Sequence, residues 1–381
     1  MKKIVFLILT LSIAIILASS YFPIKNKNLK SGTPKINGVV FDGPGDPPIT
    51  EKMVQDIKKS NAEWVAVIPE AITYVNTLNV KSFLNKGQWY GESMEGALIT
   101  IKHAKKNNLK VMMKPHIQLS HDLSGWEEPE DIDFQNKEDI KKYLESRAAY
   151  ISTQKKLTKG GGRAFEPINE EDWNTWEKEY EKFILECAKI ADANAVELFC
   201  IGTKLSKSAV KRSDFWKSLI KKVKKIYDGP LTYGANWDNY KNISFWNELD
   251  YIGISAYFPI TRGNSPTFEA ILKGWKSHHN EIKNISIKFD KPVLFTEYGY
   301  RSVAAAGIKP WENNAQNDKV DFENQNLLYK GIYQTFWNEL WFQGGFIWKW
   351  YHSGNGGKHS YSPQEKKALE TIKKQYASDS Q

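Results

Sequence analysis

Cysteine is scarce in this chain of 381 residues, which contains only Cys187 and Cys200. Each cysteine lies within an apolar pattern, so we expect two buried free thiols rather than a disulfide. Two thiols without a neighbouring histidine cluster do not form a zinc site. No other motif indicates a metal ion or an organic cofactor, and we expect the protein to work with neither.

A compact arginine-rich stripe and a glycine-rich phosphate loop are also missing. The formal net charge is +9, from 53 Lys and Arg against 44 Asp and Glu. The lysines, however, are spread over the faces of predicted helices, so nucleic acid is not the expected partner. No strand is followed by a nucleotide-binding glycine motif. With 41% hydrophobic residues the chain can bury a large core. We expect the protein to be a monomer.

No apolar run is long enough to be a clear membrane-spanning helix. Lys2 and Lys3 precede an apolar run at 4–18, which ends at the small residues of a cleavage site, Ala18-Ser19-Ser20. Residues 1–20 are therefore predicted to be a signal peptide, or an N-terminal anchor if they are not cleaved. Residues 21–35 are predicted to be a linker. We expect export to the periplasm or the exterior, with membrane contact only through an uncleaved N-terminal segment.

Strand-like and helix-like segments alternate along the rest of the chain. The predicted strands are 36–43, 64–71, 110–117, 196–203, 230–237, 251–258, 292–299 and 344–351. The predicted helices are 49–62, 93–108, 175–194, 213–229, 243–250, 268–283, 320–340 and 362–377. Eight such units predict one α/β domain over 36–378, a (β/α)₈ or TIM barrel. A doubly wound sheet seldom repeats the unit eight times.

The ends of the predicted strands carry polar and aromatic side chains. Active sites of such barrels lie at the carboxyl ends of the strands. The residues there are Asp42, Asp46, Glu70, Lys114, His116, Lys204, Asn236, Asp238, Tyr257, Glu297, Trp348 and Trp350. Glu297 stands out because it follows a buried apolar run, where a lone charge costs several kcal/mol unless it is paired. The 14 tryptophans include several near these ends, where flat rings suit the faces of sugars. About half of the tryptophans are expected merely to pack helices.

The strand motifs resemble glycoside hydrolase family 113, which contains retaining (β/α)₈ enzymes including β-1,4-mannanases. The motifs are GVVFDGPGDPP, VMMKPHI, LFCIGTKL, YIGISAYFPI, PVLFTEYGY and GGFIWKWY, and they span about 37–350. By this resemblance Glu297 is the catalytic nucleophile, Tyr257 its hydrogen-bond donor and Trp348 a platform for the sugar. The resemblance also implies sugar-binding roles for Asp42, Lys114, His116 and Asn236. The expected partner is an oligosaccharide or polysaccharide.

The chain departs from this family at the fourth strand, where the family has Gly-Thr-Glu and this sequence has Lys204. That glutamate is the general acid/base of the family. The ordinary pKa of a lysine side chain, about 10.4, makes it a reluctant acid at neutral pH. We therefore expect an ion pair between Lys204 and Glu297, and impaired hydrolysis, because general acid/base catalysis contributes roughly 10²- to 10⁴-fold in rate.

Two alternatives remain open at this point. The first is an active retaining glycosidase whose acid comes from the long polar segment 118–173, which includes the acidic run 126–134 and could fold over the barrel mouth. Glu197 is expected instead to form an ion pair at the barrel floor, and Asp214 to lie near a helix N-cap. The second alternative is a barrel scaffold that no longer binds sugar.

Overall fold

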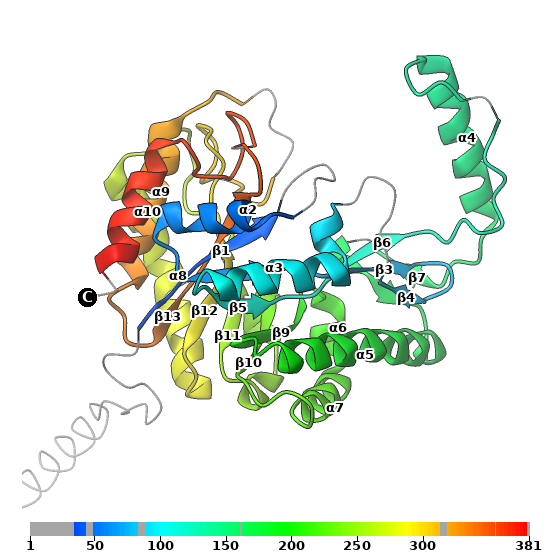
Figure 1. The fold of residues 1–381 in the computed structure, drawn as a ribbon, viewed down its shortest axis with the longest axis horizontal. Helices are drawn as coiled ribbons and strands as arrows, with labels where there is room; N and C mark the ends of the chain where they lie inside the picture. The colour runs from blue at the N-terminus through cyan, green and yellow to red at the C-terminus, as the bar shows by residue number, and fades with distance from the viewer. Residues whose placement is uncertain are drawn as a thin grey trace, which may run out of the picture.

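The structure, a computed structural model, describes residues 34–42, 49–82, 89–130, 132–160, 162–312, 318–354 and 356–378. The predicted signal peptide, almost all of the predicted linker and Asp46 lie outside these residues. Within them, eight parallel strands close into a barrel in the order β1-β13-β12-β11-β10-β9-β5-β2. The predicted (β/α)₈ barrel is confirmed (Figure 1).

The barrel strands follow the predicted pattern closely. They are β1 (Ile36–Asp42), β2 (Trp64–Val67), β5 (Lys110–Met113), β9 (Leu198–Thr203), β10 (Leu231–Asn236), β11 (Ile252–Ser255), β12 (Val293–Tyr298) and β13 (Phe342–Tyr351). Three predicted strands are about half as long as expected. The strand predicted at 251–258 ends at Ser255, and the other two end early because Pro69 and Pro115 lack the N–H that a sheet ladder needs. Beyond these prolines the chain forms β3 (Glu70–Tyr74) and β6 (His116–Ser120), which pair with each other and with β4 (Val80–Lys81) in a separate small sheet.

Helices surround the barrel. They are α2 (Glu51–Gln55), α3 (Met94–Lys106), α5 (Glu170–Ala193), α6 (Ser206–Lys211), α7 (Ser213–Val223), α8 (Phe268–Phe289), α9 (Phe322–Phe336) and α10 (Lys367–Ser378). The predicted helix 49–62 is wrong in its second half, which is a 3₁₀ turn at Asp56–Ser60, and Thr50 caps α2 by accepting the Met53 N–H. The predicted helix 243–250 is only a 3₁₀ turn at Phe245–Glu248. Among the described helices, none is long and apolar enough to cross a bilayer.

Side chains alternate between the inside and the outside of the barrel along each strand. Val40, Met112, Leu198, Cys200 and Leu294 belong to the core inside the barrel. A much larger core fills the layer between the strands and the helices, and it includes Trp216, Trp275 and Trp337, as predicted for helix-packing tryptophans. Both cysteines are buried free thiols, as predicted. The inside row of each strand leads upward to the mouth of the barrel.

The predicted loop 118–173 contains a helix that the sequence analysis missed. Helix α4 (Lys137–Thr153) buries no residue. It projects from the body of the protein beyond β6 (Figure 1). The chain returns through a small ribbon, β7 (Thr158–Lys159) with β8 (Glu166–Pro167). We call residues 122–156 the arm. The expectation that this segment folds over the barrel mouth is not met by the described residues.

Candidate active site

The inward-facing positions of the strands bring the site residues together at the mouth of the barrel. On β9 and just beyond it, Lys204 continues the row of Leu198 and Cys200 into the mouth of the barrel. Lys114 continues the row of Met112 in the same way. Glu297 would face outward by simple alternation. However, Ile254 pairs with Phe295 and Ser255 pairs with Glu297, so β12 holds one extra residue. This β-bulge turns the Glu297 carboxylate inward.

The carboxylate of Glu297 is fully buried and binds three side chains. Lys114 Nζ lies 2.5 Å from Oε1. Lys204 Nζ lies 2.6 Å from Oε2, and the Tyr257 hydroxyl donates to the same oxygen at 3.0 Å. Lys114 is itself completely buried, whereas the Lys204 side chain is 28% exposed. The ion pair expected between Lys204 and Glu297 is therefore confirmed.

The charges around Glu297 decide its protonation. Burial alone would raise the pKa of Glu297. The ammonium groups of Lys114 and Lys204 outweigh burial and hold this pKa well below its ordinary value. Burial lowers the pKa of Lys114, although the negative charge of Glu297 opposes this shift. Glu297 is therefore an ionised carboxylate, ready to act as a nucleophile but held by two cations.

His116 lies between Glu297 and a second carboxyl group, that of Glu70. His116 Nε2 lies 3.8 Å from Glu297 Oε1, and Nδ1 lies 3.9 Å from Glu70 Oε1. Burial and the nearby charge of Lys114 keep the pKa of His116 well below its ordinary value, so the imidazole is neutral. Burial, with the charge of Asp42, raises the pKa of Glu70 to about 7, although a hydrogen bond from Gln118 and the charge of Lys349 act against it.

The raised pKa of Glu70 predicts a pH-dependent stability. In the unfolded chain this carboxyl group has a pKa of about 4.5, so between roughly pH 4.5 and pH 7 the folded state binds more protons. The contribution of the Glu70 carboxyl group to the free energy of unfolding is therefore fully present below pH 4.5 and is lost as the pH rises through about 7. We expect the wild-type free energy of unfolding to fall by roughly 2 to 3 kcal/mol more than that of Glu70→Gln between about pH 5 and pH 8. Urea unfolding of both proteins at the two pH values measures this, and parallel curves would contradict it.

Trp348 forms one wall of the site. Its ring lies parallel to that of His116, with centroids 6.3 Å apart. The ammonium groups of Lys114, Lys204 and Lys349 lie 5.4, 5.6 and 5.3 Å from the Trp348 ring. Lys349 also forms an ion pair with Asp42 at 2.5 Å. Lys349 was missed by the sequence analysis, although it lies between two tryptophans that were noted.

Several predicted residues lie at the rim but outside this cluster. Asn236 is buried at the end of β10, where its amide donates to Asp238. Trp350 packs in the core outside the barrel and not in the cleft. Glu197 pairs with Lys105 at 2.6 Å, as expected for the floor. The described acidic residues of the run at 126–134 are exposed on the arm, and they are Glu127, Glu128, Glu130 and Asp133.

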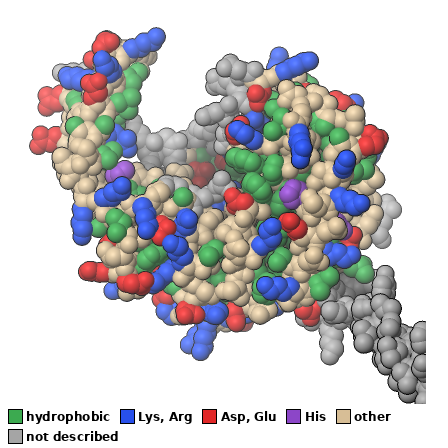
Figure 2. Space-filling view, turned by 180° about the vertical axis from the view of Figure 1, so that it is seen from behind, with side chains coloured by type: hydrophobic (Ala, Val, Ile, Leu, Met, Phe, Trp, Pro, Cys, Tyr) green, Lys and Arg blue, Asp and Glu red, His purple; other side chains and the backbone are tan. Residues whose placement is uncertain are grey.

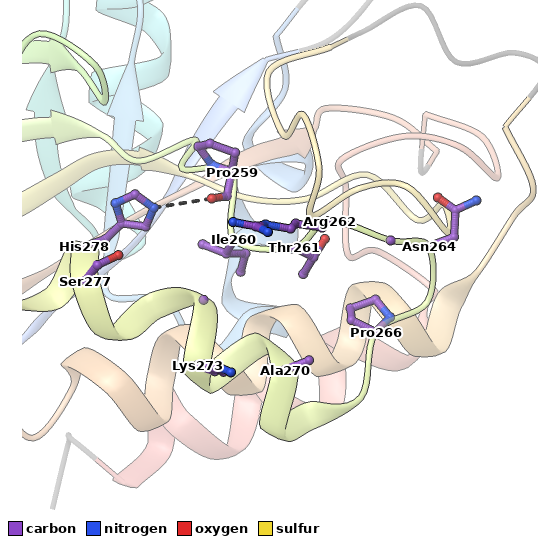
Figure 3. Close-up of a pocket in the computed structure, with 12 residues that line it drawn as sticks. Pro259, Ile260, Thr261, Arg262, Asn264, Pro266, Ala270, Lys273, Ser277 and His278 are labelled. Atoms are coloured by element: carbon purple, nitrogen blue, oxygen red, sulfur yellow. Dashed lines mark hydrogen bonds between the residues drawn. The ribbon is translucent and has the colours of Figure 1, made fainter.

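A separate cavity lies away from the residues around Glu297. It has a volume of about 720 Å³ and lies between the loop after β11 and helix α8. Figure 3 shows Arg262 and Lys273 at this cavity, with a hydrogen bond from His278 to the Pro259 carbonyl group. The residues that line it include no carboxylate and no contact of Glu297. In the described part of the chain, no cluster of three or more His, Cys, Asp or Glu side chains could hold a metal ion.

An ionised carboxylate beside an indole ring at the mouth of such a barrel is an arrangement that glycoside hydrolases use. The sequence profile of Glycoside Hydrolase Family 113 matches residues 164–368. This match covers more than half of the chain, and the chain belongs to that family. The resemblance inferred from the strand motifs is therefore confirmed, and membership implies binding of an oligosaccharide or polysaccharide.

Solved structures share the fold. A GH113 β-1,4-mannanase in a complex has a TM-score of 0.69 with 20% identity, covering 91% of this chain and 100% of that chain. The GH113 β-mannanase AaManA from Alicyclobacillus acidocaldarius, in complex with ManMIm, has a TM-score of 0.68 with 19% identity, covering 92% and 100%. A β-galactosidase of Kluyveromyces lactis is 35% identical over 89 residues, which are 23% of this chain and 6% of that enzyme. The chain thus spans only a small part of this last relative.

Proposed function

We propose that the protein binds β-linked, mannan-type oligosaccharides around Glu297 and hydrolyses natural ones weakly or not at all. One observation carries this proposal: Lys204 Nζ lies 2.6 Å from the Glu297 carboxylate. Retaining glycosidases instead place two carboxyl groups about 5 Å apart there. The mannan-type substrate is supported by the fold that this chain shares with β-mannanases of family 113.

The proposed roles follow from the contacts of each group. Glu297 is the nucleophile, and Tyr257 orients it through the hydrogen bond to Oε2. The side chain at the position of the acid is a lysine, a residue type that is a poor proton donor near pH 7, so the leaving sugar departs without acid assistance. Trp348 supports the sugar ring. The remaining polar groups proposed to hydrogen-bond the sugar are Asp42, Lys114, His116 and Asn236.

The proposal is tested by titration with β-1,4-mannohexaose. We expect quenching of tryptophan fluorescence and little release of shorter sugars. Trp348→Ala is expected to weaken binding by about tenfold, because truncating a central aromatic contact usually costs more than about 1 kcal/mol. The matched control is Trp64→Ala, at the opposite end of the barrel, which should leave the affinity unchanged. Absence of quenching would favour a scaffold that binds no sugar, and ordinary turnover would contradict the impairment.

A second candidate function is an active retaining glycosidase with a relocated acid. Glu70 favours it, because its pKa of about 7 leaves it partly protonated near neutral pH and one imidazole separates it from Glu297. The described carboxylates of the arm support the candidate less, since they are exposed. Turnover in the same assay that survives Lys204→Ala would favour this candidate.

We also propose that the protein is exported. The proposal rests on the basic residues, apolar run and small-residue site at 1–20. An uncleaved N-terminus would hold the protein at the membrane. N-terminal sequencing of the mature protein distinguishes the two states.

A further inference from the structure

Two adjoining cavities lie between Lys204 and the base of the arm. A cavity of about 450 Å³ is lined by His116, Lys204 and six other residues. A second cavity of about 550 Å³ is lined by Lys155, Lys156 and eleven others. The two cavities share Leu119 and Gly162, so they adjoin. We call this pair of cavities the arm groove.

The side chains that line the arm groove carry positive charges and no negative ones. Lys204, Lys155 and Lys156 line it, together with two histidines, and neither Asp nor Glu is among the lining residues that the structure describes. Lys155 and Lys156 are exposed, and neither forms an ion pair within the described part of the chain. Not every cavity is lined in this way, because one beside α7 is lined by Glu177, Glu181 and Asp214 as well as by cations. The cavity in Figure 3 also has cations and no described carboxylate, but the arm groove alone of these three includes Lys204 in its lining.

Several ammonium groups gather at the inner end of the arm groove. Lys114 and Lys204 share one carboxylate, that of Glu297. Lys349 is paired with Asp42. Among the described residues, Lys114 and Lys204 thus share the carboxylate of Glu297, and Glu70 lies on the other side of His116. A partly buried cation is stabilised by an anionic partner.

We propose that the arm groove binds an anionic polysaccharide, one whose sugars carry carboxylate or sulfate groups, in extension of the cleft at Glu297. This inference rests on the proposed sugar-binding function and names its substrate class. The arm is the element that supplies the outer end of the groove, because Lys155 and Lys156 directly follow α4. Figure 2 shows the arm rising from the body, with Lys and Arg side chains over the surface below its base.

The test compares two hexamers of equal length and linkage on the full chain by isothermal titration calorimetry. The first is β-1,4-mannohexaose, and the second is a β-1,4-mannuronate hexamer, in which C6 is a carboxylate. We expect the mannuronate to bind roughly tenfold more tightly at about 20 mM salt, and this preference to fall below about threefold at 500 mM, because salt screens charges that are exposed. A mannohexaose with sulfate esters shows whether charge alone or the carboxylate is recognised.

Matched double variants locate the preference. Lys155→Gln with Lys156→Gln is expected to remove most of the preference for mannuronate while leaving the affinity for mannohexaose unchanged. Arg262→Gln with Lys273→Gln removes the same charge from the cavity in Figure 3 and should leave the preference intact. Equal affinity for the two hexamers, or loss of the preference in both double variants, would overturn the inference while the proposed function stands. Failure to bind either hexamer would contradict the proposed function itself.

Discussion

Replacing Lys204 with glutamate is expected to raise the rate of β-1,4-mannohexaose hydrolysis by about 10²- to 10⁴-fold, the usual contribution of general acid/base catalysis. Lys114, whose Nζ lies 2.5 Å from Glu297, is not changed by this substitution, so the nucleophile is expected to stay ionised. The introduced carboxyl group lies beside that negative charge, which favours its protonated form. It can then donate a proton to the leaving sugar. A reducing-sugar assay before and after the substitution measures the gain.

The geometry around Lys204 accommodates this change. A glutamate side chain is one bond shorter than lysine, so its carboxyl group ends farther from Glu297, closer to the separation of about 5 Å in retaining enzymes. Lys204 has a φ of 54°, in the left-handed region. Glutamate adopts that conformation at the same backbone cost as lysine, because both have an unbranched Cβ. The substitution therefore adds no new backbone strain.

Lys204→Gln is the matched control for this gain. It removes the ammonium group but supplies no proton, so it is expected to leave hydrolysis of the natural substrate low. With an aryl mannoside, whose phenolate leaves without protonation, the advantage of Lys204→Glu over Lys204→Gln should shrink. A folded Lys204→Glu protein that binds mannohexaose and releases no product would show that more than the acid/base group is missing.

Replacing Glu297 with glutamine is expected to lower the free energy of unfolding by about 3 to 5 kcal/mol, the usual cost of removing one partner from a buried ion pair. Lys114 is completely buried, and its Nζ is 2.5 Å from Glu297. Without the carboxylate, two ammonium groups face each other with no compensating charge. Urea denaturation at pH 7 measures the change.

Two single substitutions serve as controls for Glu297→Gln. Lys114→Met removes the buried cation and is expected to be clearly destabilising, since Glu297 then keeps only one ammonium partner. Lys204→Met removes the cation that is 28% exposed, so we expect a cost of about 1 kcal/mol or less, as for solvated pairs. Adding Lys114→Met to Glu297→Gln should recover part of the lost stability. A loss below about 1 kcal/mol for Glu297→Gln would mean that the site does not depend on paired charges.

The barrel was predictable because its signals are local. Each strand is an apolar run bounded by turn residues, and the count of eight units leaves few architectures open. The convergence of strand ends placed Lys204 and Glu297 at one rim, but their expected ion pair came from the resemblance to the family, whose acid/base glutamate corresponds to Lys204. The breaks at Pro69 and Pro115 could also have been read from the sequence, since proline cannot donate to a ladder.

The register shifts and the solvated helix α4 could not be predicted from the sequence. Val39 pairs with Ile347 but Phe41 pairs with Trp350, so β13 holds an extra residue where Lys349 lies. No alternation pattern reveals which residue a bulge redirects. Helix α4 was missed for another reason. It buries no side chain, so it lacks the apolar stripe by which an amphipathic helix is recognised.

The solvated helix α4 can unfold without unfolding the barrel. No residue of α4 is buried, so fraying of this helix exposes almost no apolar surface. Its unfolding is therefore only weakly coupled to the cooperative unfolding of the barrel. Denaturation curves recorded on the whole protein will therefore report the melting of the barrel alone, and changes within 137–153 will alter the shape presented to a polymer without altering the midpoint.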